Sequence, residues 1–240
     1  GKTCVVLVDE YDKPMLDAMD TGLKTRVGDN EMLIEDHNRE TLKAFYSVFK
    51  LADADLRFVF LTGVTKFAQV SVFSGFNNAR DISMNPRFDT ICGISREELN
   101  NVFASSIEEL ANTNMLSVEE AKSQLQQRYD GYHFSNGMTD IYNPFSLLNA
   151  FADDNIRDYW FASGTPSYLM RLLAHSKEDI QDIIARSYEA QEFVDYRATV
   201  EAPVPMIYQS GYLTIKGYNR EDDEYKLDFP NHEVASGFLT

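Results

Sequence analysis

The sequence predicts an α/β fold built on parallel strands, and three stretches near its start indicate this. Residues 3–14 (TCVVLVDEYDKP) contain five consecutive apolar residues followed at once by Asp9 and Glu10. This is the pattern of a strand that is buried on both faces and carries acids at its carboxyl end. Residues 31–52 repeat apolar side chains at three-and-four spacing, the stripe of an amphipathic helix, and residues 56–64 form a second apolar strand. A connection of this length implies parallel strands, so together they predict a right-handed strand–helix–strand unit.

The segments around this unit are expected to be short helices, loops and a short strand. Residues 13–18 predict a helical turn, and residues 21–30, which contain two glycines, predict a loop. Residues 67–87 have no strong periodicity and predict an ordered loop with a helical turn. A short strand is expected at residues 90–93.

From residue 95 the pattern becomes mainly helical. Ser95 with Glu98, and Ser117 with Glu120, are capping boxes that predict two helix starts. Further helices are expected from Asn143–Pro144 and Thr165–Pro166, and from Ser176 to about Ser187, and a hairpin is expected around Asn136–Gly137.

The last part of the chain changes character again. Residues 212–218 and 224–229 alternate apolar and polar side chains on either side of an acidic loop, which predicts a β-hairpin. Helices are expected at residues 203–211 and after Pro230. We therefore divide the chain into an α/β part at residues 1–94, a helical part at residues 95–200 and a helix-and-hairpin part at residues 201–240.

The charge of the chain limits its partners. It carries 22 basic against 38 acidic side chains, a net charge of −16. Binding to a polyanion relies on excess cations that release counterions, and no run of Lys or Arg supplies them, so direct nucleic-acid binding is not expected. No apolar run approaches the roughly 20 residues of a membrane span, and the start lacks the order of a signal peptide. We expect a cytoplasmic protein without membrane contact.

The two acids after the first strand are the strongest candidates for chemistry. In an open parallel sheet the ligand crevice lies outside the carboxyl ends of the strands, where Asp9 and Glu10 would emerge. Asp9 fits a magnesium ligand, since this ion is held through one or two carboxylates together with phosphates and waters. Glu10 points the other way and fits a group that polarises the attacking water. The alternative is that both acids cap a surface turn.

Polar residues that follow the second strand would lie beside these acids if the two strands are neighbours. Thr62 and Thr65 are candidates for orienting a water, and Lys66 or Arg80 for meeting phosphate charge. The alternative is that the threonines cap a turn and that the cations are solvated.

Two other motifs carry less weight. Gly1-Lys2-Thr3 matches the end of a phosphate-binding loop, but such a loop must lead into a helix and here a strand follows. Glu224 and Lys226 match the Glu-x-Lys of restriction-type nucleases, with Asp195 as a conceivable partner, although this spacing arises easily by chance in an acidic loop.

Several strings resemble the bacterial AAA-ATPase-like family, from about residue 3 to the end and in the same order. They are 8–14 (VDEYDKP), 61–67 (LTGVTKF), 73–78 (FSGFNN), 129–134 (YDGYHF), 142–146 (YNPFS), 159–166 (YWFASGTP), 209–214 (QSGYLT) and 229–234 (FPNHEV). The resemblance implies that Asp9 is the Walker B metal ligand, Glu10 the catalytic carboxylate and Thr65 a sensor residue. It also implies a P-loop-NTPase-like sheet, a helical lid from residue 95, and a winged-helix-like element that includes the final hairpin.

Members of this family usually carry a Walker A loop before this region and a PD-(D/E)XK nuclease-like domain after it. The resemblance therefore implies an internal fragment of a protein that binds ATP and magnesium and hydrolyses ATP when whole. We expect the fragment to be inactive and to hold no cofactor. The alternatives are a non-catalytic module that binds a protein partner through the lid, and a metal-dependent nuclease that uses Glu224 and Lys226.

Overall fold

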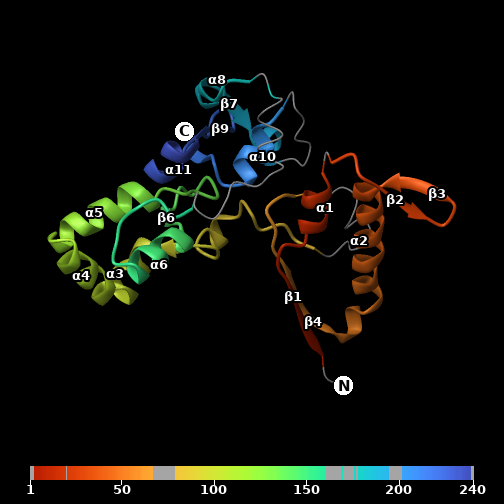
Figure 1. Cartoon of the computed structure of the whole chain (residues 1–240), viewed down its shortest axis with the longest axis horizontal. Helices are drawn as coiled ribbons and strands as arrows, with labels where there is room; N and C mark the ends of the chain where they lie inside the picture. Colours follow the sequence, from red (N-terminus) through yellow and green to blue (C-terminus); the bar gives the residue numbers. More distant parts are fainter. Residues whose placement is uncertain are drawn as a thin grey trace. The chain divides into compact units, whose positions relative to one another are not determined.

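The computed structural model has an α/β fold with a small parallel sheet and several helices (Figure 1). It describes residues 3–19, 21–66, 79–160, 169, 176, 178–194 and 202–238. By contact the chain groups into two compact units: unit 1 is Gly1–Arg80, Ser167–Ser176 and Val194–Ser210, and unit 2 is Asp81–Pro166, Lys177–Phe193 and Gly211–Thr240. The division at residues 94 and 200 stays a prediction.

Unit 1 contains the expected strand–helix–strand arrangement. Strands β1 (Cys4–Val8) and β4 (Leu56–Leu61) pair in parallel, and α2 (Ile34–Leu51) makes the crossover between them. Two shorter elements, α1 (Lys13–Ala18) and the 3-10 helix η1 (Asp53–Asp55), complete the connections. The sequence therefore predicted this unit and its parallel pairing correctly.

The two faces of the β1–β4 pair differ in burial. One face packs on α2, where Tyr46 and Phe49 are 2% and 8% exposed (Figure 1). On the other face Val5, Leu7 and Phe58 are 54%, 69% and 54% exposed. The expectation that β1 is buried on both faces is therefore wrong for this chain, because an apolar run predicts that a strand can be covered but does not supply the element that covers it.

The segment before α2 also differs from expectation. Residues 21–30 were expected to form a loop, but β2 (Lys24–Val27) and β3 (Asn30–Leu33) pair as an antiparallel hairpin. The connection is the two-residue turn Gly28-Asp29, in which Gly28 adopts φ +62°. A glycine takes this left-handed conformation without steric cost, which suits a tight hairpin. Consequently α2 begins at Ile34, three residues later than expected.

Unit 2 is built around packed helices. These are α3 (Arg96–Val102), α4 (Ala104–Thr113), α5 (Val118–Tyr129) and α6 (Pro144–Ala152). Their shared core includes Ile107, Leu110 and Leu125, which are fully buried. Helices α3 and α4 are separate, because the chain leaves helical geometry at Phe103.

Both expected capping boxes are present. At the start of α5 the Ser117 hydroxyl accepts from the Glu120 amide, and the Glu120 carboxylate accepts from the Ser117 amide and hydroxyl at 2.8 and 2.6 Å. The hydrogen bonds from Ser117 stabilise the ionised carboxylate and lower the pKa of Glu120 below 4.5. Asn143 caps α6 in the same manner by accepting from the Ser146 amide.

Replacing Ser117 by Ala is expected to reduce the free energy of unfolding by about 1 kcal/mol, because the first turn of α5 loses its cap. The pKa of Glu120 is lower in the folded chain, so its contribution is full above pH 4.5 and is lost as the pH falls through the lowered pKa. Urea titrations at pH 7 and pH 3 should therefore show a smaller effect of the substitution at pH 3. An equal effect at both values would contradict the role of the ionised carboxylate.

The pairing between the helices includes one bridge of the expected hairpin and an additional strand pair. Strand β6 (Ile141–Tyr142) pairs antiparallel with β5 (Ile94–Ser95), and a single bridge joins Ile141 to Tyr132. The short strand expected at residues 90–93 thus lies at β5, after the 3-10 helix η2 (Pro86–Phe88). The tight turn expected at Asn136–Gly137 is present, since the Met138 amide donates to the Ser135 carbonyl at 3.3 Å, and the Ser135 hydroxyl accepts from the Gly137 amide and donates to Asp89.

The last part of the chain holds a three-stranded sheet in the order β7-β9-β8. Its strands are β7 (Ser187–Glu189), β8 (Thr214–Asn219) and β9 (Glu224–Asp228), so the predicted hairpin is confirmed and β7 was missed. The helices are α8 (Ile180–Ala185), α9 (Ala190–Val194), α10 (Val204–Gln209) and α11 (His232–Phe238).

Helix α8 starts four residues later than the helix expected from Ser176, because Asp179 supplies its cap by accepting from the Gln181 amide. The helix expected from Thr165, most of the loop at residues 67–87, and Asp195 lie outside the described residues. In the part of the chain that is described, no helix is long and apolar enough to cross a membrane.

Candidate active site

The candidate site lies in unit 1, where β1 and β4 end side by side. The backbone pairing continues past the strands, since the Thr62 amide donates to the Val8 carbonyl at 2.8 Å and the Tyr11 amide to the Thr62 carbonyl at 3.0 Å. This pairing brings Thr62 next to Asp9 and Glu10. The expectation that the polar residues after the second strand lie beside the two acids is therefore confirmed for Thr62.

Asp9 and Thr62 contact each other directly. The Thr62 hydroxyl donates to Asp9 Oδ1 at 2.5 Å, and the Glu10 amide donates to the same oxygen at 3.0 Å. Asp9 is exposed, and its Oδ2 makes no hydrogen bond with any described residue. One oxygen is thus fixed and the other is free, which suits a carboxylate that holds a hydrated magnesium ion through one ligand atom or through water.

Glu10 is exposed and has an unusual backbone conformation. Its φ is +50°, in the left-handed region that residues other than glycine seldom adopt. Such a residue persists where its surroundings determine the backbone, and here the Lys13 amide donates to the Glu10 carbonyl at 3.0 Å. The sharp turn leaves the Glu10 carboxylate in solvent, one residue from Asp9, where it can accept a proton from water.

Thr65, three residues after Thr62, has different hydrogen-bond partners. It is 4% exposed, and both its amide and its hydroxyl donate to Asp12 Oδ2, at 2.6 and 2.8 Å. Its carbonyl accepts from the Tyr11 hydroxyl at 2.5 Å. The hydroxyl that reaches a candidate metal ligand therefore belongs to Thr62, whereas that of Thr65 is bound to Asp12.

The two candidate cations differ in how well they are placed. The Lys66 amide donates to Gln209 Oε1 at 2.8 Å, which fixes the backbone that follows Thr65. Arg80 is exposed and has no hydrogen bond or ion pair with another residue in the described ranges. Asp9, Glu10, Thr65, Lys66 and Arg80 all belong to unit 1, but Arg80 makes no hydrogen bond or ion pair with the other four.

Asp12 and Tyr11 were not identified as site residues from the sequence. Both belong to the string at 8–14 that carries the family resemblance, but their partners lie more than 50 positions away in the chain. Their role follows only from the pairing of β1 with β4. The only signal in the sequence was that Tyr11 and Asp12 are polar and follow Asp9 and Glu10, and this does not identify the residues that they bind.

Unit 2 holds a polar cavity of about 600 Å³, bordered by the end of α5, the turn at Asp130 and the start of α11. Lys216 donates to the carbonyls of Gly131 and Pro230 at 2.6 and 2.9 Å, and burial lowers the pKa of its ammonium group. Burial raises the pKa of Asp130, which Arg96 approaches at 3.4 Å. The residues that line this cavity include none of the six candidates Asp9, Glu10, Thr62, Thr65, Lys66 and Arg80.

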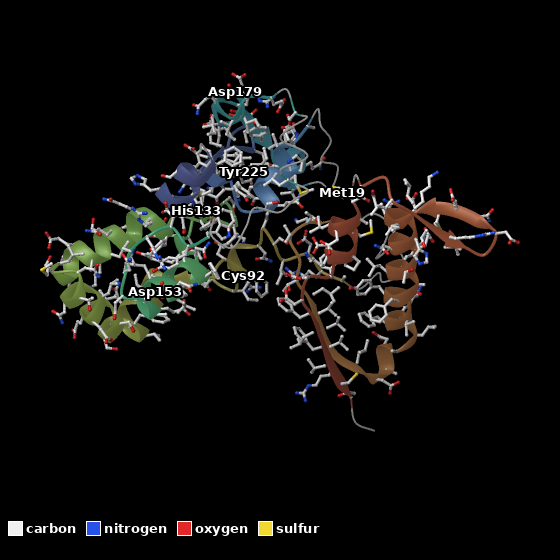
Figure 2. All side chains as sticks on the ribbon, in the orientation of Figure 1. Met19, Cys92, His133, Asp153, Asp179 and Tyr225 are labelled. Carbon is white, nitrogen blue, oxygen red and sulfur yellow. The ribbon has the colours of Figure 1, made fainter. Side chains whose placement is uncertain are left out.

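His133, labelled in Figure 2, adds to the polar interior of unit 2. Its Nε2 lies 2.8 Å from Asp140 Oδ1, and its Nδ1 lies 2.7 Å from the Ile215 carbonyl. The arrangement joins the segment after α5 to β8. These contacts occupy both ring nitrogens, so the His133 side chain has a structural role that links the two segments.

Two residues of the nuclease alternative are described by the structure. Glu224 and Lys226 lie on β9, and the Lys226 ammonium donates to the Ala185 carbonyl at 3.0 Å. Among the described residues there is no group of three His, Cys, Asp or Glu side chains that could hold a metal ion. Asp195, the third candidate, is outside the described residues.

Comparison with known proteins finds a family model that matches part of the chain and a relative that is longer than the chain. Residues 1–73 match a family model described as "Predicted AAA-ATPase" (AAA-ATPase_like). The chain is 36% identical over 241 aligned residues to "Uncharacterized protein in vnfD 5'region" of Azotobacter chroococcum mcd 1, an alignment that covers 98% of the chain. The chain spans 42% of the length of that relative. No solved structure matches the chain.

Proposed function

We propose that the chain supplies the metal-binding and water-activating half of an ATPase site, and that the full-length protein hydrolyses ATP, because residues 1–73 match the model of the predicted AAA-ATPase family. The observation that carries the proposal is the Thr62–Asp9 hydrogen bond beside Glu10 at the ends of two parallel strands. Ligands of open α/β sheets bind at this edge.

Each residue has a distinct task in the proposed site. Asp9 would hold magnesium through its free oxygen, and the bound ion would neutralise charge on the phosphates. Thr62 fixes the other oxygen of Asp9 and so sets the orientation of the carboxylate. Glu10, exposed and beside it, accepts a proton from the attacking water. We assign to Lys66 and Arg80 the contact with phosphate charge.

The remaining parts of the family architecture belong to the same proposal. The exposed apolar face of β1 and β4 supports a larger P-loop-NTPase-like core in the full-length protein, in which further elements pack there. We interpret the helices from α3 onward as the lid, through which a protein partner can bind. The β8–β9 hairpin with α11 is the proposed winged-helix-like element.

The purified 240-residue chain is expected to show no measurable ATP hydrolysis, whereas the full-length protein turns over ATP with magnesium. The sequence of 240 residues contains no complete Gly-x-x-x-x-Gly-Lys-Ser/Thr motif. Phosphate positioning supplies most of phosphoryl-transfer catalysis. Release of inorganic phosphate measures both proteins. ATP hydrolysis by the 240-residue chain that is lost in Glu10→Gln would contradict the proposal that this chain supplies only half of the site. An inactive full-length protein would favour the non-catalytic module.

A further inference from the structure

The carboxylate of Asp12 is almost completely buried, with 1% of the residue exposed. A buried charge needs strong hydrogen bonds to offset the loss of water. Asp12 finds three donors in the loop after β4: the Val64 amide to Oδ1 at 3.2 Å, and the amide and hydroxyl of Thr65 to Oδ2 at 2.6 and 2.8 Å. All three donors come from two consecutive residues of the loop, so one side chain holds that loop.

Two further observations show that the loop is held closely. The Tyr11 hydroxyl donates to the Thr65 carbonyl, so residues 11 and 12 together engage the amide, hydroxyl and carbonyl of Thr65. At Gly63 an added Cβ would lie 2.5 Å from Asp12 Oδ1 and 2.7 Å from the Tyr11 ring. The absence of a side chain at Gly63 therefore lets the loop approach residues 11 and 12 directly.

These contacts surround Thr62 on both sides. Upstream of it, β4 pairs with β1. Downstream, Val64 and Thr65 are bound to Asp12. The Thr62 backbone is itself bound to the Val8 carbonyl and the Tyr11 amide, and the Asp12 contacts add a second attachment on the two residues that follow Gly63.

We propose that Asp12 is a positioning residue: its carboxylate clamps residues 64 and 65 so that the Thr62 hydroxyl stays bound to Asp9. Its effect on turnover rests on the proposed ATPase function, but the clamp itself does not. Asp12 touches neither nucleotide nor metal in this proposal and acts through Thr62. Burial, together with the nearby charge of Asp12, raises the pKa of Tyr46 on α2.

The clamp is tested first by amide hydrogen exchange of the 240-residue chain, resolved by NMR. In Asp12→Asn the amides of Val64 and Thr65 are expected to exchange at least about tenfold faster, because the anionic acceptor is lost. The matched control is Asp17→Asn, the same change on α1 at a side chain that is 62% exposed. It should leave these two amides unchanged. Equal exchange at residues 64 and 65 in the parent chain and Asp12→Asn would overturn the proposal.

A second variant keeps the test decisive if Asp12→Asn does not fold. Thr65→Val removes only the hydroxyl donor and conserves the shape of the side chain. Because the loop is then bound more weakly, the Val64 and Thr65 amides are expected to exchange roughly three times faster. Unchanged exchange at both amides in Thr65→Val would count against the clamp, since one of its three hydrogen bonds has gone.

The effect on turnover is measured in the full-length protein. Asp12→Asn is expected to lower kcat at least about tenfold and to change KM for magnesium-ATP by less than about threefold, because misplacing Asp9 affects the transition state more than binding. An unchanged kcat with faster exchange would refute the positioning role while leaving the clamp intact. If the parent protein has no ATPase activity, the proposed function fails, and the exchange experiment still decides the clamp.

Discussion

Replacing Glu10 by Gln in the full-length protein is expected to lower kcat for ATP hydrolysis at least about 100-fold, the typical contribution of a positioned general base. Gln has nearly the same size and shape as Glu but cannot accept a proton from water at neutral pH. The side chain is exposed and makes no hydrogen bond with another described residue, so its loss should not disturb the fold. Binding of magnesium-ATP is expected to persist, because Asp9 is unchanged.

The matched control is Glu40→Gln, the same chemical change at an exposed position on α2 in the same unit. It should leave kcat within about twofold of the parent value, as is usual for surface substitutions away from a site. Steady-state phosphate release gives kcat, and equilibrium titration with a fluorescent ATP analogue gives the affinity. Activity of Glu10→Gln equal to that of the Glu40→Gln control would remove Glu10 from the mechanism.

The sequence was sufficient to predict the parts of the fold that local patterns determine. The two capping boxes depend on residues three apart, and both are present. The strand–helix–strand unit follows from apolar runs and the length of the crossover. The β2–β3 hairpin also had a local signal, since Gly28-Asp29 is a two-residue turn sequence between alternating side chains. The end of β3 could not be predicted, because the apolar helical pattern of α2 follows it directly.

The features that the sequence could not provide depend on distant partners. Which face of β1 is covered is decided by what packs on it, and the apolar run is equal on both faces. Ile141 pairs with Ser95, a distant position in the chain that no turn connects to it. Glu233 is completely buried and accepts from the amides of Tyr159 and Trp160, more than 70 residues away. Its acidic side chain alone predicted a surface position.

The turn at Gly131 shows how strongly such distant contacts can constrain one residue. Its φ is +94°, a conformation that a residue with a Cβ seldom adopts. An added Cβ would collide with the Pro230 carbonyl and would lie 2.7 Å from the Lys216 ammonium. That ammonium is the group that joins the carbonyls of Gly131 and Pro230. A methyl group here therefore strains the backbone and also displaces a buried cation from its acceptors.

Gly131→Ala is accordingly expected to reduce the free energy of unfolding of unit 2 by about 3 kcal/mol, as the sum of left-handed strain and overpacking. The matched control is Gly211→Ala, since Gly211 also has a positive φ, +80°, but an added Cβ there would lie no closer than 3.7 Å to the Trp160 ring. It is expected to cost about 1 kcal/mol, from strain alone.

Urea unfolding followed by fluorescence compares the two variants within one unit, because Trp160 is the single tryptophan of the chain and its ring lies 4.8 Å from that of Tyr212, centroid to centroid. Both glycines and this probe belong to unit 2. The difference between the two losses isolates the steric part of the effect, since the backbone strain is common to both. Equal losses would show that the turn yields to the methyl group and that the Lys216 contacts do not hold it against Pro230.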